Sequence, residues 1–212
     1  MVGRGTFITL EGGEGTGKST QVERLADWLR HGGREVVVTR EPGGTPLAEA
    51  VRSVLLDPDH DPDGLVELFL LEAARRDHTE RVVRPALEAG AVVVCDRYAD
   101  SSTVYQGMVR GVGVAEVERL NRIATGGLEP DRTVVFDLDP REGLARARRR
   151  NATGDGSSTR LDDEPDPFHD AVRAGFLRLA EAHPERVVVV DARGPADEIF
   201  RRVLDALHGV LT

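Results

Sequence analysis

The segment FITLEGGEGTGKST, residues 7–20, joins a short apolar run to a glycine-rich turn followed by a lysine and a serine. The spacing Gly12-x-x-x-x-Gly17-Lys18-Ser19 is that of a phosphate-binding loop. Glycines let successive backbone N–H groups converge on an anion, and the helix expected after the loop points its positive dipole end to the same place. Lys18 suits the β- and γ-phosphates, and the Ser19 hydroxyl suits Mg²⁺. The segment therefore predicts a nucleoside triphosphate. The residues predicted to contact it here are Gly12, Gly13, Glu14, Gly15, Thr16, Gly17, Lys18, Ser19 and Thr20.

Five short runs rich in β-branched residues alternate with stretches of helical period, and these elements must position the loop. Continuous apolar strands alternating with helices are typical of a parallel sheet covered on both faces, so we predict an α/β fold. We see no repeat and no second domain, so residues 1–212 are expected to form a single domain. The predicted strands are 7–10, 35–39, 91–95, 133–138 and 187–191, and the clearest helices are 21–30, 65–84 and 167–182.

Ligands of open parallel sheets bind at the carboxyl ends of the strands, so the residues after each strand carry the most information. Asp96 follows the third strand, where a carboxylate suits the Mg²⁺ of a triphosphate, and the planar fork of Arg97 suits a phosphate. Arg40 follows the second strand, and it is either structural or faces a second phosphate. Arg75 lies in the helix 65–84, where a charged face is normally solvated, and composition alone does not raise it above that interpretation.

Residues 148–167 are polar and rich in Gly, Ser, Asp and Pro. Such a segment is either a disordered surface loop or a lid, and the phosphate-binding loop upstream favours a lid. Arg146 and Arg150 lie at the end of the preceding helix, where cations are favourable in any protein. Together with Arg160 in the outer half of the segment, they are also placed to close over a transferring phosphoryl group, which gains most from positive charge.

The chain has 28 Lys and Arg against 37 Asp and Glu, a net charge of −9. Nucleic acid and anionic membranes are therefore not expected as partners, and a phosphorylated substrate requires a local concentration of arginine. The single cysteine, Cys95, cannot form an internal disulfide. The first residues show no apolar signal segment, and no apolar stretch approaches the ~20 residues of a membrane span. These features predict a cytoplasmic protein.

Five segments in this order and spacing resemble the bacterial thymidylate kinases, nucleoside-monophosphate kinases of the P-loop class. The resemblance extends over nearly the whole chain, and it implies a five-stranded parallel sheet flanked by helices, with a lid segment. It also implies transfer of the γ-phosphoryl group of ATP to dTMP, Mg²⁺ as cofactor, and a homodimer. The segments are FITLEGGEGTGKST, TREPGGT (39–45), AARRDH (73–78), DRYADSSTVYQG (96–107) and TRLDDEPDPFHDAVRAGFLRLA (159–180).

The resemblance also implies roles for individual residues. Arg97 is expected to bind the dTMP phosphate, Glu14 to face the sugar 3′-hydroxyl, and Arg75 to reach the thymine edge. Tyr105 is expected to crowd the 2′ position and so favour deoxyribose. The residues expected to bind dTMP are Glu14, Arg40, Leu71, Arg75, Arg97, Ser102, Tyr105 and Gln106. The residues expected to bind ATP are 12–20 with Arg146 and Arg150. Ser19 and Asp96 are expected to hold Mg²⁺. The residues expected to carry catalysis are Lys18, Asp96, Arg97 and Arg160.

Three residues depart from the family pattern. Leu71 stands where family members often place an aromatic ring against thymine, and the loss of a stacking ring predicts weaker base affinity. In the lid, Thr159 replaces an Asp and Asp162 replaces a Glu. The phosphate loop itself has no basic residue between Gly12 and Gly17, so lid arginines are expected to supply the charge.

Two other functions are compatible with the phosphate loop. A sister kinase acting on another nucleotide or a deoxynucleoside would share the fold and differ in the acceptor pocket. An ATP-driven switch that binds a partner protein would need neither the DRY segment, residues 96–98, nor an arginine-bearing lid.

Overall fold

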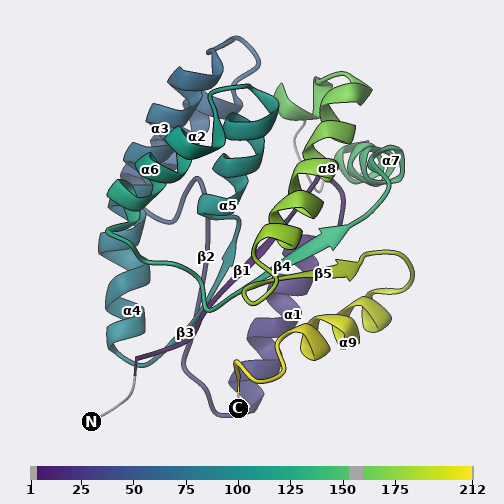
Figure 1. Cartoon of the computed structure of the whole chain (residues 1–212). Coiled ribbons are helices and arrows are strands. Elements are labelled where there is room, and N and C mark those ends of the chain that lie inside the picture. Colours follow the sequence, from purple (N-terminus) through teal and green to yellow (C-terminus); the bar gives the residue numbers. More distant parts are fainter. Residues whose placement is uncertain (1–3, 153–159, 212) are drawn as a thin grey trace.

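A five-stranded parallel sheet forms the centre of the molecule, in a computed structural model that describes residues 4–152 and 160–211. The strand order is β2-β3-β1-β4-β5, and helices lie on both faces (Figure 1). This architecture confirms the predicted α/β fold with a five-stranded parallel sheet, and each predicted strand lies within two residues of an observed one. The strands are β1 Phe7–Gly12, β2 Val36–Arg40, β3 Val92–Asp96, β4 Arg132–Asp137 and β5 Val187–Asp191.

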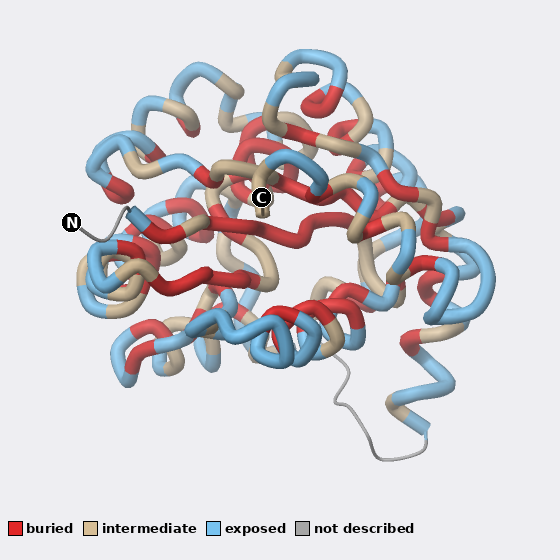
Figure 2. The backbone as a smooth tube through the Cα atoms, turned by 90° about the horizontal axis from the view of Figure 1, so that it is seen from below, coloured by how far each residue is buried: buried red, intermediate tan, exposed pale blue. Residues whose placement is uncertain are grey.

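Side chains alternate between the two faces of the sheet, because neighbouring residues of a strand point to opposite sides. Ile8 and Leu10 of β1 pack in a core cluster with α1 and α9, whereas Phe7 packs in a cluster on the other face with Val83 and Tyr98. The central strands are accordingly buried on both faces (Figure 2), which explains why they appear in the sequence as continuous apolar runs.

The helices connect the strands and carry the loops at the carboxyl edge of the sheet. The predicted helix 65–84 is real, but it is divided: α3 ends at His78, a π-helical turn spans Thr79–Val83, and α4 follows. The helices are α1 Lys18–His31, α2 Pro46–Leu56, α3 Gly64–His78, α4 Arg84–Glu88, α5 Ala99–Ser102, α6 Val114–Thr125, α7 Pro140–Ala152, α8 Asp166–Ala182 and α9 Ala196–Ala206.

Two glycines let the phosphate loop and the first turn of α7 approach closely. A Cβ on Gly15 would lie 1.9 Å from the carbonyl oxygen of Gly143, and a Cβ on Gly143 would lie 2.3 Å from the carbonyl oxygen of Glu14. Gly15 also has a φ of +66°, which L side chains rarely adopt. The loop is thus fixed against α7 by backbone contact that any side chain would prevent.

The centre of the predicted lid, residues 153–159, lies outside the described residues, and it includes Thr159. Its described flanks are the end of α7 and a 3₁₀ turn, Arg160–Asp163, just before α8. Within residues 4–152 and 160–211, no helix is both long and apolar enough to span a bilayer.

Candidate active site

The phosphate loop opens onto a cavity of about 520 Å³, which we call the phosphate cavity. Five basic and four acidic side chains line it, so the lining has a slight excess of positive charge in a chain whose net charge is −9. The lining residues are Glu14, Gly15, Thr16, Gly17, Lys18, Ser19, Thr20, Arg40, Glu41, Arg52, Leu56, Asp96, Arg97, Arg150 and Asp162.

Lys18 is buried and folds back over its own loop. Its Nζ donates to the carbonyl oxygens of Gly12, at 3.0 Å, and Gly13, at 2.8 Å. Burial, reinforced by the positive charge of Arg97, lowers the pKa of Lys18, although Glu14 and other carboxylates act in the opposite direction. The ammonium group is therefore held at the mouth of the loop by weak carbonyl partners that a phosphate oxygen can replace.

The two predicted magnesium ligands are brought together by the fold. Ser19 Oγ, in the first turn of α1, donates to Asp96 Oδ2 at the end of β3 over 2.9 Å. Both residues line the phosphate cavity. A hydroxyl and a carboxylate oxygen on one side of a phosphate-binding cavity are the hard ligands that Mg²⁺ prefers.

Arg97 lies at the junction of the site, with a left-handed backbone (φ 71°) directly after β3. Its Nη2 donates to Glu14 Oε1 at 2.6 Å and its Nη1 to Ser101 Oγ at 3.2 Å. The guanidinium also lies over the ring of Tyr105, 5.3 Å from the centroid. Burial alone would raise the pKa of Glu14, but Arg97 and Lys18 outweigh it and hold that pKa below its ordinary value.

A second cavity of about 80 Å³, the inner cavity, adjoins the first, and Arg97 and Glu41 line both. Six of the eight residues predicted to bind dTMP line the inner cavity, which brings together α3, the loop after β3 and the π-helical turn Thr103–Val109. The other two, Glu14 and Arg40, line the phosphate cavity. The lining residues of the inner cavity are Glu41, Pro42, Leu71, Arg75, Arg97, Tyr98, Ser101, Ser102, Tyr105, Gln106 and Leu161.

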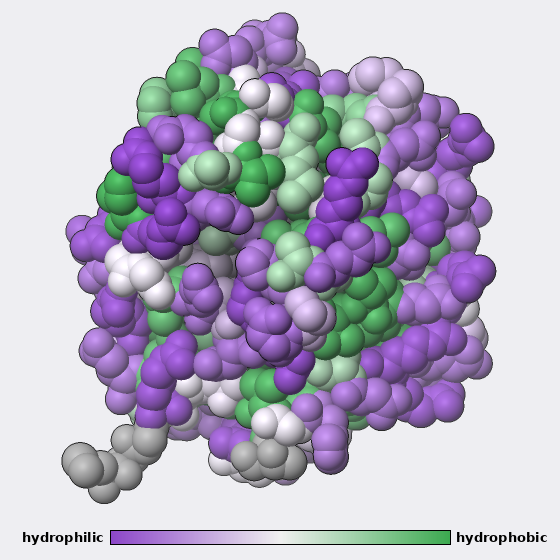
Figure 3. All heavy atoms as spheres, viewed as in Figure 1, coloured by the Kyte–Doolittle hydropathy of each residue, from purple (hydrophilic) through white to green (hydrophobic). Residues whose placement is uncertain are grey.

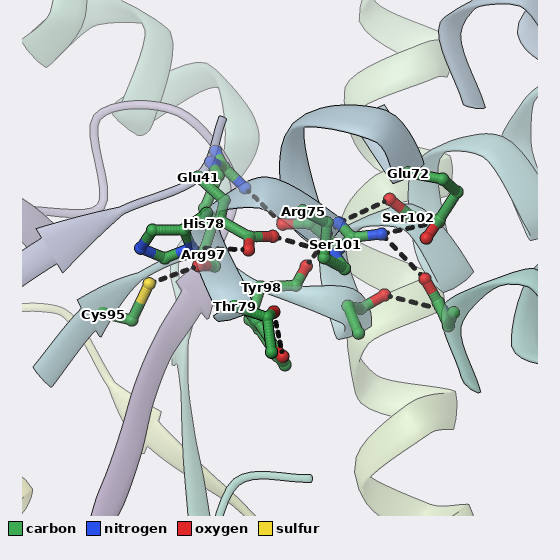
Figure 4. Close-up of polar contacts among 12 residues, drawn as sticks. Glu41, Glu72, Arg75, His78, Thr79, Cys95, Arg97, Tyr98, Ser101 and Ser102 are labelled. Carbon is green, nitrogen blue, oxygen red and sulfur yellow. Dashed lines mark hydrogen bonds and ion pairs between the residues drawn. The ribbon is translucent and has the colours of Figure 1, made fainter. Parts of the chain in front are cut away.

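Arg75 is only 2% exposed, so the interpretation of its helix face as solvated is wrong for this residue. Its guanidinium donates to the carboxylates of Glu41, at 2.8 Å, and Glu72, at 2.6 Å, and to the hydroxyl of Ser102, at 3.0 Å (Figure 4). Asn121 Oδ1 accepts a further bond at 2.8 Å. Arg75 is thus held rigidly in the wall of the inner cavity.

The other predicted arginines differ in their partners and in whether they line the phosphate cavity. Arg40 is exposed and pairs with Glu49 at 2.9 Å, while Arg150 lines the phosphate cavity. Arg146 donates to Glu142 Oε1 at 2.6 Å and to the carbonyl oxygen of Ala192 at 3.3 Å. Arg160 is directed toward α3, where its Nη2 lies 2.6 Å from Glu67 Oε1.

Sequence reasoning missed several residues of the site, among them Glu11, Arg52 and Glu67. Glu11 is fully buried beneath Arg97 and accepts from the backbone N–H of Tyr98, at 2.8 Å, and from Ser101 Oγ, at 2.6 Å. Arg52 lines the phosphate cavity from α2, and Glu67 is buried in α3. The only signal for Glu11 and Glu67 in the sequence is a carboxylate within an apolar run.

Comparison with known proteins assigns the family. The sequence model of the thymidylate kinase family matches residues 10–203. A thymidylate kinase of Desulfosudis oleivorans is 51% identical over 207 residues, covering 96% of this chain and 97% of that protein. A thymidylate kinase of Deinococcus radiodurans is 50% identical over 204 residues, again with 96% and 97% coverage. The crystal structure of thymidylate kinase from Ehrlichia chaffeensis superposes with a TM-score of 0.76 at 32% identity, covering 97% of this chain and 99% of that one.

The buried carboxyl of Glu11 makes stability depend on pH. Burial raises its pKa from 4.5 to about 7, although Arg97 opposes the shift. Between these values the folded protein binds more protons than the unfolded chain, so the free energy of unfolding should fall as pH rises from 5 to 8. At about 1.4 kcal/mol per pKa unit, Glu11→Gln should remove roughly 2–3 kcal/mol of that fall. Urea unfolding of the wild type and the variant at pH 5 and at pH 8 measures this fall in unfolding free energy.

The matched control is Glu88→Gln, at an exposed position of α4, which should keep the wild-type difference between the two pH values. If Glu11→Gln also keeps the wild-type difference in unfolding free energy, burial does not raise the pKa of Glu11.

Proposed function

Because the chain belongs to the thymidylate kinase family, we propose that it transfers the γ-phosphoryl group of ATP to dTMP, with Mg²⁺, and releases dTDP for dTTP biosynthesis. It is an enzyme, and its reaction is the phosphorylation of dTMP. The observation that supports the proposed geometry is the position of Arg97, which lines both the phosphate cavity and the inner cavity. One arginine at this junction suits the phosphate of an acceptor whose base lies in the inner cavity.

The donor is proposed to bind along the phosphate loop. Backbone N–H groups of residues 12–20 and the N-terminus of α1 suit the β- and γ-phosphates, and Lys18 would exchange its carbonyl partners for phosphate oxygens. Arg150 would add charge from the end of α7. Arg146 lies one turn before Arg150 in α7 and donates to the carbonyl oxygen of Ala192, the residue after β5. It is proposed to bind a part of ATP farther from the γ-phosphate.

Ser19 and Asp96 are proposed to hold Mg²⁺, directly or through water. Their oxygens, 2.9 Å apart on the wall of the phosphate cavity, fit a small hard cation. Once bound, the ion would neutralise charge that develops on the phosphate oxygens. Asp96 therefore has two roles in the proposal, because its Oδ2 also accepts from Ser19 Oγ in the first turn of α1.

The acceptor is proposed to place its base in the inner cavity and its phosphate against Arg97. Arg75 and Ser102 would meet the thymine edge from a wall that is already rigid. Tyr105, held by the rings of Phe168 and Phe176, would narrow the space beside the sugar and disfavour a 2′-hydroxyl. Leu71 offers only an aliphatic surface to the base.

Two residues near the acceptor phosphate complete this part of the proposal. Glu14, whose carboxylate is paired with Arg97, is proposed to face the 3′-hydroxyl. Arg40, paired with Glu49 on the wall of the phosphate cavity, is proposed to reach the acceptor phosphate.

Arg160 is proposed to meet the charge on the transferring phosphoryl group. It must leave Glu67 to do so, since the two side chains form an ion pair at 2.6 Å. The flank that carries Arg160 is a single 3₁₀ turn, Arg160–Asp163, which is a short element to displace. Phosphoryl transfer thus requires a second position of this flank when both substrates are bound.

The fold is shared by other P-loop kinases and by switch proteins, but the comparisons do not favour either alternative. Relatives named thymidylate kinase match across nearly the full length of the chain. A cytoplasmic location is proposed because nucleotide metabolism takes place there and because the single cysteine is a buried thiol.

A homodimer is proposed through the face made by α3 and α6. Leu65, Val66 and Phe69 of α3 are 43%, 45% and 56% exposed, and Ile123 of α6 is 61% exposed. Apolar side chains appear at the upper left of Figure 3, where Figure 1 places α2 and α3. Exposed apolar side chains gathered on neighbouring helices are typical of a protein interface.

The proposed activity predicts an order of acceptors. With ATP and Mg²⁺, dTMP should be phosphorylated faster than dUMP, and both far faster than UMP. The thymine methyl group contributes only ~1–3 kcal/mol, so some dUMP turnover is expected. Acceptor-dependent release of ADP measures the order, and Lys18→Ala should abolish release with every acceptor.

Equal rates with dTMP and UMP would contradict the role of Tyr105. Release of ADP that no acceptor stimulates would contradict the kinase activity itself.

The proposed dimer predicts the effect of one surface charge. Sedimentation velocity should give the wild type twice the 23.0 kDa mass of the chain, and Phe69→Glu should give a monomer. Trp28→Glu is the matched control, because Trp28 is a 47% exposed apolar residue on α1. A dimer that survives Phe69→Glu, or one that Trp28→Glu disrupts instead, would place the interface elsewhere.

A further inference from the structure

Glu67 is a buried carboxylate on which three separate segments converge. It lies in α3 with only 2% of its surface exposed. Its Oε2 accepts from Gln106 Nε2 at 2.8 Å, and its Oε1 accepts from Arg160 at 2.6 Å and from Arg110 at 3.3 Å. Both oxygens are therefore committed, and the plane of the carboxylate is fixed by donors on opposite sides.

The orientation of the Gln106 amide follows from this contact. A carboxylate oxygen only accepts, so the NH₂ group of Gln106 must face Glu67. The carbonyl oxygen, Oε1, is then the remaining acceptor, and it is buried without a hydrogen-bond partner among the described residues. An unpaired buried acceptor costs about 1–3 kcal/mol, which a ligand N–H can recover. Gln106 lines the inner cavity, where the base is proposed to bind.

The spacing of α3 places Glu67 beside that cavity. Glu67, Leu71 and Arg75 are four residues apart, so they lie along one face of the helix. Leu71 and Arg75 line the inner cavity directly, whereas Glu67 reaches it through Gln106. One helix face thus supplies an apolar surface, a fixed donor and, through Glu67, a fixed acceptor.

We propose that Glu67 is a positioning residue that selects pyrimidines carrying a hydrogen on N3, by fixing Gln106 as an acceptor toward the base. The inference rests on the proposed function. Thymine and uracil present N3–H, which donates to an acceptor, whereas N3 of cytosine is itself an acceptor. Two acceptors facing each other leave both groups unpaired, so a cytosine nucleotide is disfavoured.

The test is Glu67→Gln, which exchanges one acceptor oxygen for a donor. The carbonyl of the new amide should stay with Arg110, and with Arg160 until that side chain moves to the phosphoryl group, and its NH₂ group should then face Gln106. The Gln106 amide would turn over and present its NH₂ group to the base. Initial rates with dTMP and dCMP should show the ratio of kcat/KM for dTMP over dCMP fall about tenfold or more, the value of one hydrogen bond, mainly through a higher KM for dTMP.

The matched control is Glu164→Gln, which removes the same charge from another partner of Arg110 without touching Gln106. It should keep the wild-type ratio. If Glu67→Gln does not fold, as judged by circular dichroism, Glu67→Asp replaces it. This shorter carboxylate cannot hold Gln106 and both arginines together, and the ratio should fall in the same direction.

The outcomes separate the inference from the activity on which it rests. A wild type that phosphorylates dTMP, with an unchanged ratio in the folded Glu67 variant, would overturn the inference alone. An equal fall in the ratio with Glu164→Gln would also overturn it, because loss of charge near Arg110 would then be sufficient. A wild type that releases no acceptor-dependent ADP would overturn the proposed function instead.

Discussion

The guanidinium of Arg97 is held between the carboxylate of Glu14 and the ring of Tyr105, and the arrangement of the site depends on this contact. The residue has a left-handed backbone, which costs of order 1 kcal/mol for a residue with a Cβ. Its N–H donates to Leu10 at 3.0 Å, and its carbonyl oxygen accepts from the Cys95 thiol (Figure 4). These contacts turn the chain at the end of β3, so that the side chain lies between the two cavities.

Carboxylates of the chain hold the basic residues in place before any substrate binds. Glu14 pairs with Arg97, Glu49 with Arg40, and Glu67 with Arg160. Such pairs avoid isolated charges in a partly buried site, and each leaves an arginine that a phosphate can compete for. An acidic protein can thus bind anionic substrates, because five of its basic side chains line the phosphate cavity.

The fold and much of the site could be predicted because they depend on local pattern. The five strands are continuous apolar runs, and the phosphate loop and Arg97 directly follow strands, where ligands of parallel sheets bind. Contacts between distant segments could not be predicted in this way. Glu67 meets residues 39, 43 and 93 positions away, and Arg75 is buried only because Glu41 and Asn121 come to it from other segments. The local sequence offered only one signal for Glu67, a carboxylate within an apolar run.

The most direct test of this account measures how much Arg97 contributes to binding the phosphate of the acceptor. Isothermal titration with dTMP and with thymidine, on the wild type and on Arg97→Gln, separates the phosphate from the nucleoside. Charge-assisted hydrogen bonds contribute about 1.5–3 kcal/mol, so the variant should bind dTMP roughly 10- to 100-fold more weakly. Its affinity for thymidine should stay within about threefold of the wild type. Unchanged affinity for dTMP, or an equal loss for both ligands, would contradict the placement of the acceptor phosphate at Arg97.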